Sequence, residues 1–138
     1  LRTEEAGNMA SATSIYPGVR RQLTALQKEL AARQNVVMDG RDIGTAVLPD
    51  AQLKIYLTAS SHVRAVRRYE ELKAKGVDSD LSVIEADIIA RDQRDMTREI
   101  SPLCKAADAV EVDSSELTID EVVETVRKLY QERTGASV

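Results

Sequence analysis

The stretch Val36-Val37-Met38-Asp39-Gly40-Arg41-Asp42-Ile43-Gly44-Thr45 decides the fold expected of this 138-residue chain. It begins as a short, continuous apolar run, which is typical of a buried parallel strand. The run then passes into a turn that holds two glycines, a guanidinium and two carboxylates. Glycine allows the backbone to approach a ligand closely, and an arginine beside an acid can bind an anion while the acid accepts hydrogen bonds. We therefore predict a ligand site in this turn; the alternative is a strand-to-helix turn held by a salt bridge.

Hydrophobic spacing on both sides of the turn predicts strands that alternate with helices. Pro17 suits the first turn of a helix whose apolar positions recur every three to four residues and should form one buried face. That face consists of Val19, Leu23, Leu26 and Leu30. After a loop and short helix in residues 1–15, the expected helices cover 17–33, 61–75, 78–99 and 118–133, and the expected strands cover 36–39, 53–58 and 109–112. This order indicates an α/β fold with a parallel sheet covered on both faces. Because three strands make a thin sheet, we expect the remainder to lie upstream of Leu1.

Composition excludes several classes of function. Aromatic residues make up only 3% of the chain, without Trp or Phe, so a stacking platform for single-stranded nucleic acid is not expected. The net charge of −4 argues against a duplex-binding surface. Cys104 and His62 are the only residues of their types, which argues against disulfides, a histidine-based metal site and a Ser-His-Asp triad. We expect a buried thiol and a surface imidazole. The sequence has no signal peptide and no apolar run of membrane-spanning length, so we expect a cytoplasmic protein without a membrane partner.

Arginine is strongly preferred over lysine, 13 residues to 6, which suits bidentate recognition of phosphate or carboxylate. Six of these arginines lie in the helical hairpin expected over residues 61–100: Arg64, Arg67, Arg68, Arg91, Arg94 and Arg98. Helical spacing puts Arg91, Asp95 and Arg98 on one face, and such faces could close over a nucleotide's phosphates. The alternative is a pair of solvated helices joined by ion pairs. The sequence contains no Gly-x-x-x-x-Gly-Lys-Ser/Thr loop to bind the phosphates of a donor nucleotide.

Taken together, a set of motifs strongly resembles the bacterial cytidylate kinase family, in order and spacing, to about Tyr130. These motifs are Arg2-Thr3-Glu4-Glu5-Ala6-Gly7-Asn8-Met9-Ala10-Ser11, Tyr16-Pro17-Gly18-Val19-Arg20, the stretch 39–45, Pro49-Asp50-Ala51, Ala90-Arg91-Asp92-Gln93-Arg94-Asp95, and Pro102-Leu103 with Ala106-Ala107-Asp108-Ala109. The resemblance implies transfer of the γ-phosphate of ATP to CMP or dCMP with Mg²⁺. It also implies a P-loop nucleoside monophosphate kinase fold, a three-layer parallel sheet with a CMP-binding insert and a helical lid.

The same resemblance implies roles for individual residues. Ser11, Arg20 and Asp42 would read the cytosine, since a hydroxyl, a guanidinium and a carboxylate can satisfy its acceptors and its amino group. On the residues alone, a helix cap for Ser11 and a surface ion pair for Arg20 remain open. The resemblance further places the acceptor phosphate on Arg41, the sugar hydroxyls on Asp95, the catalytic role on Arg91 and Arg98, and a donor-side lid role on Arg64, Arg67 and Arg68.

The match also implies a division of the chain and a missing part. Residues 1–35 would be the end of the CMP-binding insert and the following helix, 36–60 core strands, 61–100 lid helices, and 101–138 the C-terminal strand and helix. The chain resembles the C-terminal three-fifths of the enzyme, without the P-loop lysine. We therefore expect the chain alone to be inactive, Mg²⁺ to be bound with ATP mainly by the missing part, and the full-length enzyme to be a monomer. The alternatives are a non-catalytic nucleotide-binding or interaction domain, and a kinase for another nucleotide such as UMP.

Overall fold

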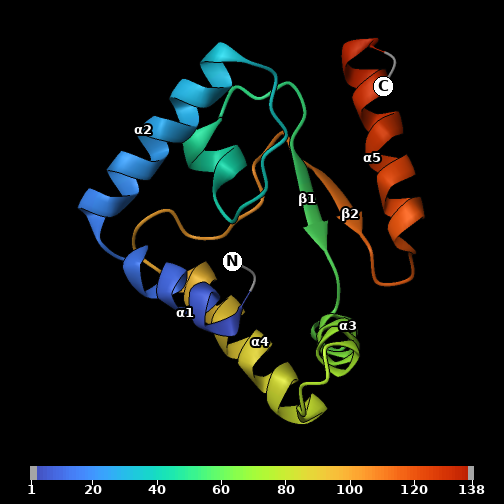
Figure 1. Ribbon diagram of the computed structural model, residues 1–138. Helices are drawn as coiled ribbons and strands as arrows, with labels where there is room; N and C mark the ends of the chain where they lie inside the picture. Colours follow the sequence, from blue (N-terminus) through green and yellow to red (C-terminus); the bar gives the residue numbers. More distant parts are fainter. Residues whose placement is uncertain (1–2, 137–138) are drawn as a thin grey trace.

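A computed structural model describes residues 3–136 (Figure 1). Along the described chain the elements are α1 (Glu4–Thr13), α2 (Pro17–Arg33), the π-helical turn η1 (Ile43–Val47), β1 (Ile55–Thr58), α3 (Ser61–Ala74), α4 (Leu81–Thr97), β2 (Val110–Asp113) and α5 (Ile119–Thr134). The fold is therefore of the α/β type, with more helix than sheet. Arg2, with which the first matching motif begins, lies outside the described residues.

The sheet described for residues 3–136 consists of β1 and β2, which pair in parallel. Ile55 lies opposite Val110, and the register continues to Thr58 opposite Asp113. The α3–α4 hairpin forms the crossover between the strands, and Figure 1 shows it projecting beyond the carboxyl end of β1. The strands expected over 53–58 and 109–112 are confirmed, with boundaries shifted by one or two residues.

The strand expected over 36–39 is wrong, because this segment has no regular structure. Val37 in its centre is fully exposed, at 103% of its reference area. A strand exists through the hydrogen bonds that a neighbouring strand supplies. Among residues 3–136 the sheet consists of β1 and β2 alone. The apolar run therefore has the composition of a strand, but no neighbouring strand pairs with it.

The helix boundaries follow capping residues, as the sequence predicts. The hydroxyl of Ser60 caps α3, and the carboxylate of Asp80 accepts hydrogen bonds from the first backbone N–H groups of α4. At α5 the Thr118 hydroxyl accepts from the Glu121 N–H at 3.2 Å, while the Glu121 carboxylate accepts from the Thr118 N–H at 2.8 Å. Each cap satisfies amide groups that have no partner within the helix. These local signals explain why the helices were predicted well.

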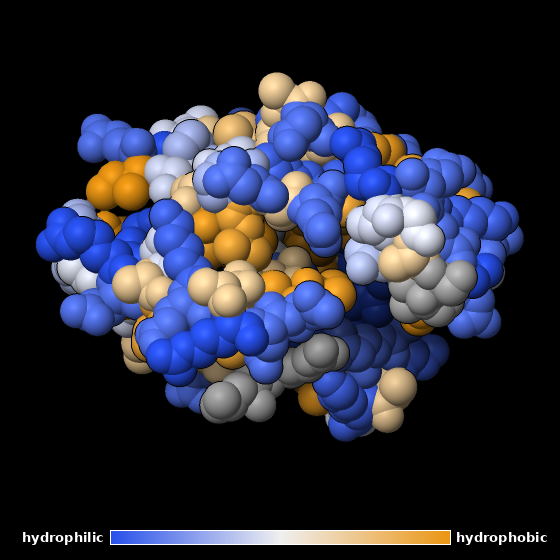
Figure 2. Space-filling model, turned by 90° about the horizontal axis from the view of Figure 1, so that it is seen from above, coloured by the Kyte–Doolittle hydropathy of each residue, from blue (hydrophilic) through white to orange (hydrophobic). Residues whose placement is uncertain are grey.

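The apolar face of α2 is exposed, which corrects the expectation that it is buried. Leu26 is 60% exposed and Leu23 53%, and no residue of α2 is buried. Figure 2 shows apolar side chains exposed among polar ones on the face seen from above. Helical periodicity predicts which residues share a face but does not supply the element that covers it. Among the described residues, α2 packs mainly against η1.

The α3–α4 hairpin has the most extensive helix–helix contact in the described chain. Ala65 of α3 is completely buried, and Nδ1 of His62 lies 3.0 Å from a carboxylate oxygen of Glu85 across the hairpin. The imidazole of His62 is exposed, as expected. Cys104 is also exposed, so the expectation of a buried thiol is wrong. It lies in the irregular segment between α4 and β2, and such segments run over protein surfaces. No helix within residues 3–136 has the length and apolar character needed to cross a bilayer.

Candidate functional site

The turn that carries Arg41 and Asp42 is held in a tight conformation. The carbonyl of Asp42 accepts hydrogen bonds from the N–H groups of Ala46, at 2.9 Å, and Val47, at 3.3 Å. The side chain of Val47 is buried and anchors the turn. At Gly40, a Cβ atom would lie only 2.8 Å from Cγ1 of Ile43, so a larger residue there would have to displace the Ile43 side chain. The two charged side chains therefore project from a well-supported backbone.

Arg20 of α2 forms an ion pair with the carboxylate of Asp42. Each side chain is only 14% exposed, so the pair is largely withdrawn from water. Arg20 therefore does not form the surface ion pair that was open on sequence alone. The pair joins α2 to the turn across 22 residues of sequence. A salt bridge, which is the alternative to a ligand site on the sequence alone, therefore does hold the turn, and its partner is α2.

Asp95 of α4 is buried and lies among arginines from two parts of the chain. Nε of Arg41 donates to its carboxylate, and Nη1 of Arg98 lies 3.9 Å from the other carboxylate oxygen. Nε of Arg98 also donates to the Ser101 carbonyl at 2.7 Å, while the Asp95 carbonyl accepts from the Leu103 N–H at 2.8 Å. These bonds fold the segment after α4 back onto the helix, and they fix Arg98 beside Asp95.

Arg91 lies one helical turn before Asp95 and completes the cluster. Its Nε is buried and has no acceptor within the described chain. Burial lowers the pKa of Arg91, and the positive charge of Arg41 lowers it further, against the opposing effect of the Asp95 carboxylate. The guanidinium groups of Arg41 and Arg98 therefore lie beside the Asp95 carboxylate, and the charge of Arg91 interacts with both Arg41 and Asp95, so the arginines of this cluster outnumber that carboxylate. Such a cluster can bind an anion.

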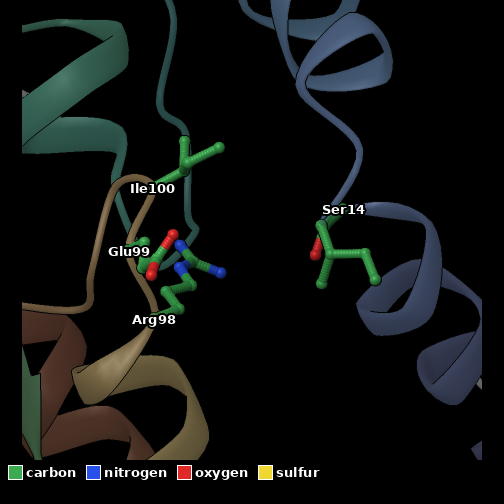
Figure 3. A pocket seen from close by; sticks show the side chains of 5 residues that line it. Ser14, Arg98, Glu99 and Ile100 are labelled. Carbon is green, nitrogen blue, oxygen red and sulfur yellow. The ribbon is translucent and has the colours of Figure 1, made fainter.

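A depression of about 210 Å³ opens beside this cluster. Figure 3 shows Ser14 on one side of it, with Arg98, Glu99 and Ile100 on the other. Ser11 lies in α1, one turn before Ser14, and its carbonyl accepts from the Ser14 hydroxyl at 2.8 Å. Ser11 is not the helix cap, because Thr3 caps α1. Sequence analysis missed Ser14 and Ile100, and no signal in the sequence marks them beyond their closeness to the matching motifs.

The three arginines of α3 do not join this cluster. Arg64 makes a two-pronged ion pair with Asp92 across the hairpin, and Arg68 pairs with Glu71 of its own helix at 2.8 Å. Arg67 donates to the hydroxyl of Ser114 at 3.2 Å and to its carbonyl at 2.5 Å. Solvated helices joined by ion pairs therefore describe Arg64 and Arg68 well, while Arg67 ties α3 to the end of β2.

Comparison with known proteins decides the family. The sequence model of the family described as "Cytidylate kinase" matches residues 1–132. The chain belongs to this family. It is 51% identical to the cytidylate kinase of Ligilactobacillus salivarius strain UCC118 over 133 residues, which are 96% of the chain and 59% of that relative. It is 47% identical to that of Fervidobacterium nodosum over 133 residues, or 96% of the chain and 61% of the relative.

The cytidylate kinase of Geobacillus sp. strain WCH70 is 47% identical over 135 residues, which cover 98% of the chain and 60% of that relative. The chain therefore spans about three-fifths of the length of these relatives. The resemblance stated from the sequence motifs is confirmed at the level of the family. The cluster around Asp95 therefore lies in a chain of the cytidylate kinase family. The α/β structure described above is the part of the family's fold that this chain spans.

Proposed function

We propose that this chain forms the acceptor side of a cytidylate kinase, which transfers the γ-phosphate of ATP to CMP or dCMP and yields ADP with CDP or dCDP in pyrimidine nucleotide metabolism. The observation that carries the proposal is the excess of guanidinium groups around Asp95, including the buried Nε of Arg91 without an acceptor among the described residues. A buried donor without a partner costs free energy, and an anionic ligand would supply the acceptor.

The acceptor nucleotide would meet two groups of residues. Arg41 would hold its phosphate, since a guanidinium matches phosphate oxygens in a two-pronged geometry. Asp42, Arg20 and Ser11 would read the cytosine: the carboxylate accepts from the amino group at position 4, and the donors bind the ring acceptors. The Arg20–Asp42 ion pair supports this role, because it holds a donor and an acceptor side by side at a largely buried point.

Asp95 would accept hydrogen bonds from the sugar hydroxyls, while Arg91 and Arg98 would stabilise the phosphoryl group in transit. Phosphoryl transfer depends on positioning and on neutralising charge at the moving group. Removal of one such arginine from a full-length cytidylate kinase with these residues should lower kcat by about 10²-fold or more. An increase in KM with unchanged kcat would instead assign that arginine to substrate binding alone.

These 138 residues do not include a loop of the kind that binds the phosphates of the donor nucleotide. Their sequence has no phosphate-binding loop of the Gly-x-x-x-x-Gly-Lys-Ser/Thr type. Within residues 3–136 no three His, Cys, Asp or Glu side chains gather into a group that could hold a metal ion. Because Mg²⁺ in kinases is usually held by the phosphates of the nucleotide and one or two carboxylates, we propose that the ion enters with ATP and is bound mainly by residues outside this chain. We propose that the chain alone does not turn over.

The same proposal has consequences for the complete sheet, the division of the chain, the oligomeric state and the cellular location. The sheet would extend to the three-layer form of a P-loop nucleoside monophosphate kinase, with residues 1–35 ending the CMP-binding insert and 61–100 forming the lid. Arg64, Arg67 and Arg68 would then lie on the donor side of that lid. The enzyme would be a cytoplasmic monomer that binds neither nucleic acid nor membranes.

Calorimetric titration of the chain with CMP, UMP and AMP tests the base assignment. We expect CMP to bind most tightly, and we expect Asp42→Ala to weaken CMP binding by about tenfold or more, since it removes a hydrogen bond to a charged group. Glu29→Ala is the matched control, because Glu29 forms an exposed pair with Arg33 on the same α2 helix. Equal affinity for UMP would overturn the assignment of Asp42 to the cytosine.

The missing loop motif also favours a second candidate, a nucleotide-binding domain without catalysis. Both candidates predict binding of CMP. A coupled assay of ADP release separates them when the chain is mixed with a polypeptide that supplies the phosphate-binding loop. Turnover in the mixture favours the kinase, while robust turnover by the chain alone would refute our proposal that it is inactive.

A further inference from the structure

We propose that the Asp95 carboxylate is paired with Arg41 in the absence of substrate. When substrate binds, the phosphate of the nucleotide replaces this carboxylate on Arg41. This inference rests on the proposed function, because it assigns Arg41 to the acceptor phosphate. It adds a competition inside the site: one guanidinium serves first a carboxylate of the protein and then a phosphate of the ligand.

The relative depth of the two side chains supports the exchange. The Asp95 side chain is 9% exposed, whereas that of Arg41 remains 39% exposed while its Nε donates to the Asp95 carboxylate. The carboxylate therefore lies deeper and the guanidinium lies nearer the solvent. An anion that enters from solvent reaches Arg41 first and meets the carboxylate as a competitor for the same donors. Both groups accept two parallel hydrogen bonds from arginine, so a phosphate can take the place of the carboxylate.

The charge of the surroundings favours a phosphate over the carboxylate. Arg41 and Arg98 form ion pairs with Asp95, and Arg91 lies close enough to feel its charge. The other acid whose charge acts on Arg91 is Asp92, and it is paired with Arg64. A phosphate monoester carries a charge of about −1.5 to −2 near neutral pH, whereas a carboxylate carries −1. The phosphate therefore compensates the excess positive charge more completely.

Exchange would leave Asp95 buried without Arg41, and an unpaired buried carboxylate is unfavourable. Two groups could restore its hydrogen bonds: Arg98, whose Nη1 already lies 3.9 Å from Oδ1, and the sugar hydroxyls of the ligand. A nucleotide brings a phosphate for Arg41 and hydroxyl donors for Asp95 at the same time. Inorganic phosphate brings only the first. The exchange therefore predicts that the site discriminates against bare phosphate.

The test compares Asp95→Asn with Asp92→Asn in the 138-residue chain, titrated with inorganic phosphate and with CMP at constant ionic strength. Both variants remove one negative charge from α4, but only the first frees Arg41. We expect Asp95→Asn to raise the affinity for inorganic phosphate by about tenfold or more, because Arg41 no longer has to give up a hydrogen bond to a charged carboxylate. The gain should be far larger than the gain caused by Asp92→Asn. Unchanged or weaker phosphate binding by a folded Asp95→Asn variant would overturn the exchange, and so would an equal gain in both variants.

A measurement on the unaltered chain covers the case in which Asp95→Asn does not fold. The side-chain NMR signals of Arg41 Nε and Asp95 Cγ should shift together as CMP is added, with one dissociation constant. Binding of CMP without a shift at Asp95 would overturn the exchange and leave the proposed function intact. If the chain binds neither CMP nor inorganic phosphate, the proposed function is refuted, and the exchange with it.

Discussion

The Arg20–Asp42 ion pair offers the sharpest test of how the turn is held. We compare Arg20→Met, Asp42→Ala and the double variant. The side chains of both residues are 14% exposed, so removal of one partner leaves the other charge largely buried. Such a loss costs 3–5 kcal/mol at a fully buried pair, and the remaining exposure reduces this to about 2–4 kcal/mol for each single variant. The double variant removes both charges, so its loss should fall short of the sum by about 1–3 kcal/mol.

Urea unfolding followed by far-ultraviolet circular dichroism measures these losses. With a slope of about 2 kcal/mol per molar urea, a loss of about 3 kcal/mol from each single substitution should lower the midpoint by about 1.5 M. Glu29→Ala breaks an ion pair whose side chains are more than half exposed, and its effect should stay below about 0.5 kcal/mol. Additive losses in the double variant would show that the two charges do not stabilise each other, and the account of the turn would then be wrong.

Two further predictions concern single positions. Gly40→Ala should destabilise the chain by about 1–3 kcal/mol in the same urea experiment, because its Cβ would lie 2.8 Å from the Ile43 side chain. Gly44→Ala is the control and should be neutral or slightly stabilising, because the nearest atom to its Cβ would be at 3.4 Å. Equal losses of stability in the two variants would refute the steric argument. Hydrogen bonds, first of all from the Ser82 hydroxyl, lower the pKa of Asp80, so its capping contribution is complete above about pH 4 and is lost as the pH falls through the lower folded-state pKa. The difference in Tm between the unaltered chain and Asp80→Ala should therefore narrow on acidification, and a difference that widens would contradict the assignment.

The local features of this fold could be predicted from the sequence because they depend on near neighbours. The caps at Ser60, Asp80 and Thr118 fix where three helices begin, and each acts on a residue two or three positions ahead. The alternating residues of β1 likewise mark a strand that finds its partner in β2. These signals do not need the rest of the molecule, so they remain valid for a chain that spans part of its relatives' length.

The failures all concern what lies against an element. The run at 36–39 has the residues of a strand, and the stripe of α2 has the spacing of a packed helix, but neither is covered in the described chain. A single sequence does not show which element packs against the apolar face of another. The same limit applies to the site. Helical spacing predicts that Arg91, Asp95 and Arg98 share one face, but nothing in the sequence predicts the ion pair that Arg41 forms with Asp95 across 54 residues. The family resemblance implies only separate ligand contacts for these two residues.

The distribution of buried groups explains why the site is assembled although much of the apolar surface is open. The buried apolar residues of the described chain are Val47, Ala65 and Val112, each in a different element. What joins α2, the turn and α4 is instead a chain of charges, from Arg20 to Asp42 and from the adjacent Arg41 to Asp95. Ion pairs of this kind require a specific geometry, because a buried charge that misses its partner is costly, whereas apolar contacts tolerate displacement. The position of the turn relative to α4 is therefore determined by the same groups that we propose bind the nucleotide, so a ligand that takes over Arg41 must also rearrange a link that holds the site together.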